Sequence, residues 1–240
     1  MARRRFFVPE VRDNRAEISG DDAHHLARVL RVEPGQHYEI TDSRHVWLAM
    51  VETVDKNRVR FGVVEQFEDA PEPPRVTLYL ALIKFERFEW AVEKATELAV
   101  TKIVPVNAAR SDRGLFEGAK KRVERWRRIS KEASEQSRRS RPAEIADPIL
   151  FTQAVCDTST HRIWLDENDR AHPLIRGFTL KPGDTTAFMI GPEGGWSDTE
   201  RAAFENGPWT PASLGPSVLR AETAVCAALS VFAQIATEAV

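Results

Sequence analysis

The stretch GPEGGWSDTE, residues 191–200, holds three of the chain's 12 glycines within five positions. Glycine allows positive φ angles and lets the backbone approach a ligand closely, so that exposed N–H and C=O groups can contact a ring edge such as that of adenine. The stretch lacks the Lys-Ser/Thr pair of a phosphate-binding loop and the G-x-G-x-x-G spacing of a dinucleotide-binding fold. It therefore indicates a ligand-binding loop of another type, with a tight structural turn as the alternative.

A second stretch, SLGPSVLRAETAVCAAL at 213–229, also joins a Gly/Pro loop to an apolar helix. Arg220 and Glu222 stand at the entry to this helix. An arginine stays charged and can stabilise negative charge that develops on a substrate. The alternative is local, because a glutamate suits a helix N-terminus through the helix dipole and can pair with the arginine. Two such loops near the end of one domain suggest that both line the same pocket.

The elements that position these loops follow from hydrophobic periodicity. Residues 185–190, TTAFMI, form a predicted strand, and Ser197 with Glu200 has the S-x-x-E spacing of a capping box, which predicts a helix start at Asp198. Further strands are expected at 76–83, 102–106 and 161–165, and helices at 85–100, 117–137 and 221–239. Strands that alternate with helices predict a parallel α/β sheet, which binds ligands at the carboxyl ends of its strands.

The first 70 residues have a different pattern. Strand-like runs at 37–41, 46–54 and 58–67 are separated by turn-like segments and predict a small antiparallel sheet or barrel. Ser19 and Asp22 predict the capped start of a helix that ends before Pro34. The Pro-rich, acidic segment DAPEPPR at 69–75 suits neither a helix nor a central strand. It marks a predicted boundary between a domain at 1–70 and a domain at 71–240.

Charge is distributed unevenly along the chain. The net charge of −2 gives no general argument for a nucleic-acid partner. Residues 113–141, however, contain 11 Lys or Arg and 4 Asp or Glu, a local balance of +7 that leaves −9 for the rest of the chain. Such asymmetry is typical of one basic face that binds nucleic acid, with a solvated helix face as the alternative.

The remaining composition excludes several classes of protein. No apolar run approaches the roughly 20 residues needed to span a bilayer, and the basic start MARRRFFVPEV lacks the apolar core of a signal peptide. Cys156 and Cys226 give no disulfide framework, and no cluster of His, Cys and acidic residues has metal-ligand spacing. We therefore expect a cytoplasmic protein without a bound metal or a membrane partner.

The two C-terminal motifs, GPEGGWSDTE and LGPSVLRAETA, closely resemble those of the RsmE family of the SPOUT class, small-subunit (16S) ribosomal RNA methyltransferases that act on N3 of a uridine. RRRFFV, DDAHHLARVLRVEPG, KFERFEWAVEKATELAV and EASEQSRRS are similar to other family segments in family order, so the resemblance covers essentially the whole chain. It implies an α/β protein with a PUA-like, RNA-binding β-barrel at 1–70 and a SPOUT methyltransferase domain with a trefoil knot at 71–240. It also implies a homodimer with the active site at the subunit interface.

The resemblance further implies S-adenosylmethionine as the methyl donor, bound mostly through backbone groups. The residues expected around the donor are Leu165, Ile190, Gly191, Pro192, Glu193, Gly194, Gly195, Leu214, Gly215, Ser217, Val218, Leu219 and Thr223. Uridine N3 must lose its proton, so the site needs a base or a group that stabilises the resulting anion. Arg220 is expected to stabilise the anion and Glu222 to orient Arg220, with proton acceptance by Glu222 as the alternative.

Contacts to RNA are expected from basic side chains, which bind phosphates and fix the register without reading bases. The candidates are Arg3, Arg4, Arg5, Arg28, Arg31, Arg110, Lys120, Lys121, Arg122, Arg125, Arg128, Arg138, Arg139 and Arg141. Because N3 is hidden in a base pair, the target uridine should be unpaired or flipped out. The expected partner is small-subunit ribosomal RNA, within the assembled subunit.

The chain departs from the family pattern at three places. Ala99 and Arg138 stand where the family usually has glycine, and Ser217-Val218 replaces Arg-Ile, which removes a positive charge. Two other functions remain open. One is a SPOUT methyltransferase that acts on another RNA position, and the other is a non-catalytic RNA-binding factor in ribosome assembly. The second would have no need of the Gly-rich loop, so binding of S-adenosylmethionine distinguishes it.

Overall fold

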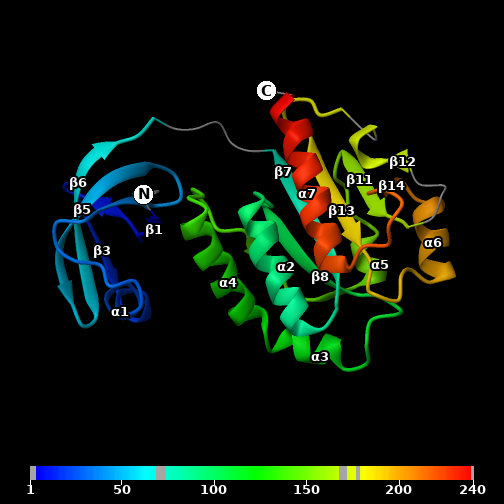
Figure 1. Cartoon of the computed structure of the whole chain (residues 1–240), viewed down its shortest axis with the longest axis horizontal. Coiled ribbons are helices and arrows are strands. Elements are labelled where there is room, and N and C mark those ends of the chain that lie inside the picture. Colours follow the sequence, from blue (N-terminus) through cyan, green and yellow to red (C-terminus); the bar gives the residue numbers. More distant parts are fainter. Residues whose placement is uncertain (1–3, 69–73, 168–171, 177–178, 239–240) are drawn as a thin grey trace. The chain divides into compact units, whose positions relative to one another are not determined.

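The computed structural model describes residues 4–68, 74–167, 172–176 and 179–238. The chain forms two compact units (Figure 1). The N-terminal unit comprises residues 1–72 together with 134–142, and the C-terminal unit comprises residues 73–133 and 143–240. Each unit has its own hydrophobic core, so the two are described separately.

The N-terminal unit is a curled six-stranded sheet, a half-barrel, with one helix. Its elements are β1 (Arg5–Phe7), β2 (Val11–Arg12), β3 (Arg15–Ser19), α1 (Asp21–Arg28), β4 (His37–Thr41), β5 (Val46–Asp55) and β6 (Arg58–Gln66). The strand order is β1-β4-β5-β6-β3-β2, with β1 parallel to β4 and the other pairs antiparallel. The predicted antiparallel strands at 37–41, 46–54 and 58–67 are confirmed as the centre of this sheet.

The core of the N-terminal unit follows the two-residue period of its strands. In β5, Trp47, Ala49 and Val51 are buried, whereas Met50 between them is exposed. Side chains of alternate residues point to opposite faces of a sheet, so β5 buries one face only. Phe6 of β1 and Phe61 of β6 lie in the same cluster, with ring centroids 6.3 Å apart.

The start of α1 differs from the prediction. Gly20, at φ 68°, is the N-cap residue, and no side chain caps the helix. Ser19 instead remains in β3, opposite Arg58 of β6. The predicted cap by Ser19 is therefore wrong, because pairing within the sheet holds this residue. The helix ends at Arg28, which is before Pro34 as predicted but several residues short of it.

The C-terminal unit is built on a parallel sheet. Its strands are β7 (Arg75–Ala81), β8 (Lys102–Asn107), β9 (Glu144–Ile145), β10 (Ile149–Leu150), β11 (His161–Leu165), β12 (His172–Pro173), β13 (Thr185–Ile190) and β14 (Thr210–Ser213). The order is β10-β8-β7-β13-β11-β14-β12, β9 also pairs with β8, and every pairing is parallel. The predicted parallel α/β sheet is confirmed.

Helices cover both faces of this sheet. They are α2 (Phe85–Glu97), α3 (Leu115–Lys120), α4 (Val123–Gln136), α5 (Phe151–Ala154), the 3₁₀ helix η1 (Leu174–Arg176), α6 (Asp198–Glu205) and α7 (Ala221–Glu238). In β13, Phe188 and Ile190 belong to the core shared with α2, α4 and α7, whereas Ala187 and Met189 belong to the core shared with α5 and α6. Figure 1 shows these two groups of helices on opposite sides of the strands. Within the described residues, none of the helices is long and apolar enough to cross a membrane.

The single helix predicted at 117–137 is wrong, because the chain forms α3 and α4 with a turn at Lys121-Arg122. The turn lets both helices pack against α2. A Cβ on Gly118 of α3 would lie 2.8 Å from the Phe85 ring, and Trp126 of α4 lies with its ring centroid 4.4 Å from that of Phe88.

Two helices end on a residue in the left-handed backbone conformation. After α2, Ala99 has φ 65°, and the backbone N–H groups of Ala99 and Val100 donate to the carbonyls of Thr96 and Ala95. After α4, Arg138 has φ 56°, and Arg139 N–H donates to the Ser134 carbonyl. These are the hydrogen bonds of the Schellman motif, in which the left-handed residue is usually glycine.

Candidate active site

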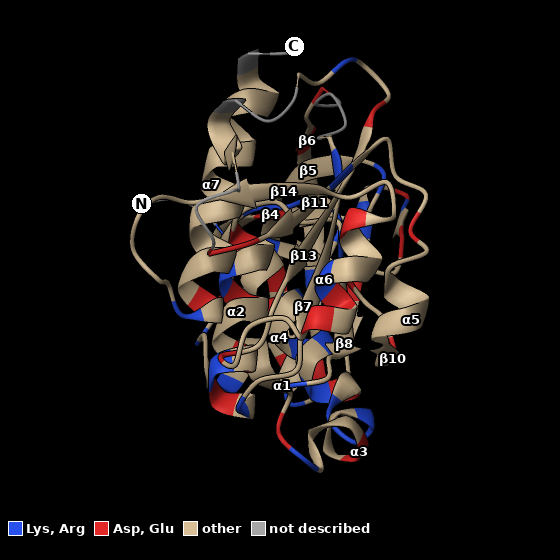
Figure 2. Ribbon diagram, turned by 90° about the vertical axis from the view of Figure 1, so that its right-hand side faces the viewer, with Lys and Arg blue, Asp and Glu red and all other residues tan. Residues whose placement is uncertain are grey.

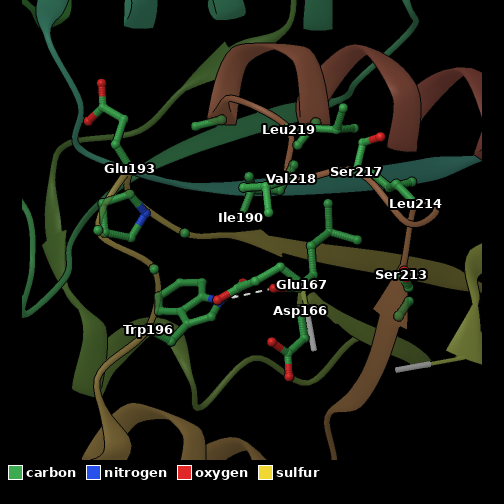
Figure 3. Close-up of a pocket in the computed structure, with 18 of the residues that line it drawn as sticks. Asp166, Glu167, Ile190, Glu193, Trp196, Ser213, Leu214, Ser217, Val218 and Leu219 are labelled. Carbon is green, nitrogen blue, oxygen red and sulfur yellow. Dashed lines mark hydrogen bonds between the residues drawn. The ribbon is translucent and has the colours of Figure 1, made fainter. Parts of the chain in front are cut away.

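A cavity of about 340 Å³ lies where three neighbouring parallel strands, β13, β11 and β14, reach their carboxyl ends (Figure 3). Three segments that follow these strands form its walls, and the first turn of α7 completes it. The lining residues are Leu165, Asp166, Glu167, Ile190, Gly191, Pro192, Glu193, Gly194, Gly195, Trp196, Ala212, Ser213, Leu214, Gly215, Ser217, Val218, Leu219, Ala221 and Ala224. This is the edge at which open α/β sheets bind ligands.

Twelve of the thirteen residues predicted around the methyl donor line this cavity, all except Thr223. Thr223 is exposed on α7, where Ala221 and Ala224 face the cavity instead. Their i, i+3 spacing is the signal that could have found them, since residues three apart share one face of a helix. The sequence interpretation also missed Asp166 and Glu167, which directly follow β11.

The glycines of the 191–195 loop are explained by close neighbours. A Cβ on Gly191 would lie 3.0 Å from the indole ring of Trp196, whose Nε1–H donates to the Leu165 carbonyl over 3.0 Å (Figure 3). Gly195 has φ 67°, and a Cβ there would lie 3.2 Å from Glu167 Oε1. Side chains other than hydrogen would therefore displace the cavity wall or strain the backbone.

The Gly-rich loop leads into α6 through the predicted capping box, which is confirmed. Ser197 Oγ accepts a hydrogen bond from Glu200 N–H, and the Glu200 carboxylate accepts from Ser197 N–H. Glu200 is only 4% exposed, and its Oε1 also accepts from Ala109 N–H over 2.8 Å. The next residue, Arg110, donates from Nη1 to the Gly194 carbonyl over 2.9 Å. Glu200 thus ties the segment after β8 to the Gly-rich loop.

The charged side chains that line the cavity are all acidic. They are Asp166, Glu167 and Glu193, and none of the described lining residues is a lysine, arginine or histidine. Arg201 of α6 pairs with Asp166 and with Glu167. Burial acts to lower the pKa of Arg201, but the two carboxylates outweigh it and raise that pKa, so Arg201 stays charged. The cavity wall therefore carries negative charge, which Arg201 partly neutralises through Asp166 and Glu167.

The predicted catalytic residues differ in their surroundings. Arg220 is exposed and forms no ion pair with any residue in the described part of the chain. Glu222 has a side chain only 13% exposed, and its Oε1 lies 3.7 Å from Nε of Arg87 in α2. Glu222 Oε2 is buried and lacks a hydrogen-bond partner among the described residues. The cation beside Glu222 is therefore Arg87, which the sequence interpretation missed, and not Arg220.

Arg87 also reaches the Gly-rich loop. Its Nη1 donates to Glu193 Oε1 over 2.8 Å. No local pattern predicts this contact, because Arg87 and Glu193 lie 106 positions apart in the sequence. Burial raises the pKa of Cys226, one turn after Glu222 in α7, so this thiol stays protonated beside the carboxylate at neutral pH.

Many of the basic residues predicted to bind RNA form ion pairs or hydrogen bonds with other residues of their own unit. In the N-terminal unit, Arg5 and Arg138 both contact Glu39, and Arg141 donates to the Ser43 carbonyl. Burial lowers the pKa of Arg139 to about 10. Arg4 is half-buried and Arg3 lies outside the described residues.

In the C-terminal unit, Arg122 and Arg125 pair with Glu89, and Lys120 pairs with Glu117. Figure 2 shows such neighbouring blue and red segments on α3. Of the predicted RNA-binding residues that the structure describes, Arg28, Arg31, Lys121 and Arg128 remain exposed with neither an ion pair nor a side-chain hydrogen bond. No group of three or more His, Cys, Asp and Glu side chains could hold a metal ion among the described residues.

Comparison with known families assigns both units. The family model described as RNA methyltransferase domain matches residues 70–233, and the model described as RNA methyltransferase PUA domain matches residues 18–64. Ribosomal RNA small subunit methyltransferase E from Bacillus subtilis is 33% identical over 226 residues, which cover 89% of this chain and 87% of that protein. The protein of the same name from Aquifex aeolicus is 29% identical, covering 94% of this chain and 97% of that protein.

Solved structures agree with this assignment. A methyltransferase structure from Legionella pneumophila with bound cofactor SAM has a TM-score of 0.86 at 30% identity and covers 96% of this chain and 97% of that chain. Ribosomal RNA small subunit methyltransferase E from Neisseria gonorrhoeae, bound to S-adenosylmethionine, has a TM-score of 0.86 at 26% identity and covers 98% of each chain. These matches confirm the resemblance noted in the sequence. The chain belongs to the family of RNA methyltransferases that includes ribosomal RNA small subunit methyltransferase E.

Proposed function

We propose that this protein is an S-adenosylmethionine-dependent methyltransferase that modifies N3 of a uridine in small-subunit ribosomal RNA. The observation that carries the proposal is the cavity at the carboxyl ends of β11, β13 and β14. The predicted donor-binding residues gather there, and two solved relatives with the same fold hold S-adenosylmethionine.

The residues of the cavity fit this cofactor. Its volume of about 340 Å³ falls within the range of small-molecule sites. When bound, S-adenosylmethionine supplies an electrophilic methyl group on a positively charged sulfur. The acidic lining and the lack of basic lining residues in the described chain suit a cationic ligand. Glycines at 191, 194 and 195 expose backbone polar groups to a ligand, while Leu214 and Leu219 offer apolar surface.

We assign the acceptor side of the reaction to Arg220. Its neighbours Leu219 and Ala221 line the cavity, and its own side chain is exposed and unpaired within the described residues. Uridine N3 must first lose its proton to a base or to water, and the negative charge of the resulting anion spreads over N3 and the two carbonyl oxygens. The anion then bonds to the methyl group as the methyl–sulfur bond breaks, which leaves a neutral methylated base and a neutral thioether. A guanidinium can donate hydrogen bonds to such an oxygen and stabilise the anion. Glu222 cannot orient Arg220 in the geometry described, because it lies beside Arg87.

RNA binding completes the proposal. The exposed cations Arg28, Arg31, Lys121 and Arg128 are the first candidates for phosphate contacts. We assign residues 1–70 to RNA binding and residues 71–240 to methyl transfer. The proposed enzyme is a cytoplasmic homodimer whose C-terminal domain is knotted and dimerises, and it acts on ribosomal RNA within the small subunit.

The test is a methylation assay with a matched pair of glycine variants. Purified protein is incubated with labelled S-adenosylmethionine and small subunits from cells lacking this gene, and the digested RNA is analysed by mass spectrometry. Gly195→Ala changes a loop glycine at φ 67°, and Gly183→Ala changes a glycine at φ 89° with open space around it. Both strain the backbone by roughly 1 kcal/mol, but only the first disturbs the cavity.

We expect 3-methyluridine with the wild type, near-normal activity with Gly183→Ala and at least tenfold weaker cofactor binding with Gly195→Ala, since about 1.4 kcal/mol is a factor of ten. A methyl group on another atom or nucleotide would overturn the N3 assignment. A wild-type protein that neither binds the cofactor nor transfers methyl groups would instead be an RNA-binding assembly factor.

A further inference from the structure

Arg87 of α2 lies between two carboxylates that belong to different walls of the cavity. Its Nη1 is 2.8 Å from Glu193 in the Gly-rich loop, and its Nε is 3.7 Å from Glu222 in the first turn of α7. Glu193 lines the cavity, and Glu222 stands between the lining residues Ala221 and Ala224. Arg87 itself is not among the lining residues, so it acts on the cavity only through its two partners.

Glu222 is the more enclosed of the two carboxylates. Its side chain is 13% exposed, against 37% for Glu193. Its Oε2 has no hydrogen-bond partner within the described structure. A carboxylate this enclosed needs a compensating cation, so when one cation is removed Glu222 attracts another positive group nearby.

The charged and titratable groups around Glu222 come from three elements. Arg87 of α2 pairs with Glu222, Glu193 of the Gly-rich loop pairs with the same Arg87, and Cys226 follows Glu222 one turn later in α7. Lys94 and Glu97 of α2 interact electrostatically with Cys226, further along the contact between α2 and α7. Arg87 is thus the cation in contact with Glu222 within the described residues.

A second cation stands close by in the sequence. Arg220 precedes Glu222 by two residues, is exposed, and has no ion-pair partner among the described residues. Without Arg87, Glu222 would be an uncompensated negative charge two residues after Arg220 and would attract this guanidinium. An Arg220 held by Glu222 would no longer be available to a substrate.

From this arrangement we propose that Arg87 is a positioning residue of the methyl-transfer site. It joins the Gly-rich loop to the start of α7 and, by compensating Glu222, leaves the Arg220 guanidinium available to the uracil ring. The inference rests on the proposed function, because it assumes that the cavity binds the methyl donor and that Arg220 serves the acceptor.

The contribution of Arg87 to global stability is small. The Arg87 side chain is 34% exposed, and ion pairs of this exposure contribute little to stability, so Arg87→Gln should lower Tm by only about 2–4 °C. Its effect should therefore appear in catalysis rather than in unfolding. Lys94 provides a matched control, because it lies on α2 and also bridges two carboxylates, Glu93 and Glu97, but joins no loop to the cavity.

The experiment compares Arg87→Gln, Arg87→Lys and Lys94→Gln with the wild type, and adds Glu222→Gln alone and combined with Arg87→Gln. Calorimetry with S-adenosylmethionine gives the dissociation constant, initial rates with small subunits give kcat and KM, and thermal scans give Tm. Arg87→Gln should lower kcat roughly tenfold, the scale of coupling between contacting charges. Arg87→Lys should restore most of it, and Lys94→Gln should match the wild type in kcat and KM.

The double variant is decisive for the role of Arg220. With Glu222 neutral, this side chain no longer competes for Arg220, so Glu222→Gln should recover part of the kcat lost in Arg87→Gln. Losses that simply add would overturn the inference. So would an Arg87→Gln protein that matches Lys94→Gln in kcat, or one that loses Tm and activity together without rescue by lysine. A wild type that does not bind the cofactor would contradict the proposed function itself.

Discussion

The Gly-rich loop after β13 and the C-terminal ends of α2 and α4 both contain left-handed backbone, but different residues adopt it. In the loop, Gly195 has φ 67°. After the two helices, Ala99 has φ 65° and Arg138 has φ 56°. The conformations are nearly the same, so the backbone angle alone does not decide where this chain keeps a glycine.

The space around each residue explains the difference. A Cβ on Gly191 or Gly195 would meet atoms of Trp196 or Glu167 at 3.0–3.2 Å. Ala99 and Arg138 are exposed, so their side chains have room, and Arg138 also pairs with Glu39. The backbone strain is of the order of 1 kcal/mol per residue, and the Schellman hydrogen bonds at both helix ends hold the backbone in place. The chain thus tolerates strain at a surface helix end but has no room for a side chain in the cavity wall.

Gly191→Val should have the largest effect of any change that tests this comparison. The new side chain would overlap the Trp196 ring, and overpacking of this kind costs about 1–3 kcal/mol. We expect binding of S-adenosylmethionine, measured by calorimetry, to weaken by one to two orders of magnitude. Gly191→Ala should show a smaller loss, and Trp196→Leu in the Gly191→Val background should recover binding. A valine variant that binds normally would show that the wall is not tightly packed.

Glu200→Ala should have the second largest effect. It removes the acceptor for Ser197 N–H and Ala109 N–H, and donors left buried without a partner cost about 1–3 kcal/mol. We expect the free energy of unfolding in urea to fall by about 1–2 kcal/mol. Glu205→Ala, at an exposed position of the same helix, should change it by less than about 0.5 kcal/mol. Equal stabilities for the two variants would mean that Glu200 does not tie the loops together.

Local patterns in the sequence were enough to predict several elements. The strands at 161–165 and 185–190 were predicted with their observed ends, because apolar runs there are bounded by polar and glycine residues. The helix start at Asp198 followed from Ser197 and Glu200, which interact over three positions. The resemblance to a family supplied most of the residues that line the cavity.

Contacts between distant segments could not be predicted in this way. The partner of Glu222 depends on how α2 packs against α7, and no spacing in the sequence reports it. Thr223 was predicted in place of Ala221 and Ala224 for a related reason: their i, i+3 spacing shows that the two alanines share a face, but tertiary packing decides which face of α7 meets the cavity. The break between α3 and α4 is likewise imposed by packing against Phe85 and Phe88.

Ala99→Gly tests the helix-end side of the comparison and should raise stability. Glycine removes the left-handed strain of about 1–2 kcal/mol but adds conformational entropy to the unfolded chain, which offsets about half of it. We expect a gain of about 0.5–1 kcal/mol in the free energy of unfolding. Cofactor binding should stay unchanged, because Ala99 does not line the cavity. A loss of stability would mean that the exposed methyl group of Ala99 makes contacts that outweigh the strain.

Arg138→Gly should give the smallest net change, because two effects oppose each other. Glycine relieves the same strain at φ 56°, but it removes an ion pair in which Arg138 Nη1 lies 3.4 Å from Glu39 Oε1. The Arg138 side chain is half exposed, and Arg5 still pairs with Glu39 at 2.8 Å, so the lost pair is worth at most about 1 kcal/mol.

The companion variant Arg138→Ala separates the two effects, because it loses the ion pair and keeps the strain. We expect Arg138→Gly to unfold at nearly the wild-type urea concentration and Arg138→Ala to be less stable by about 0.5–1 kcal/mol. Equal destabilisation of both variants would assign the whole effect to the ion pair. The arginine would then be retained for its contact with Glu39, and helix-end strain would have no measurable influence on which residue this chain can accept there.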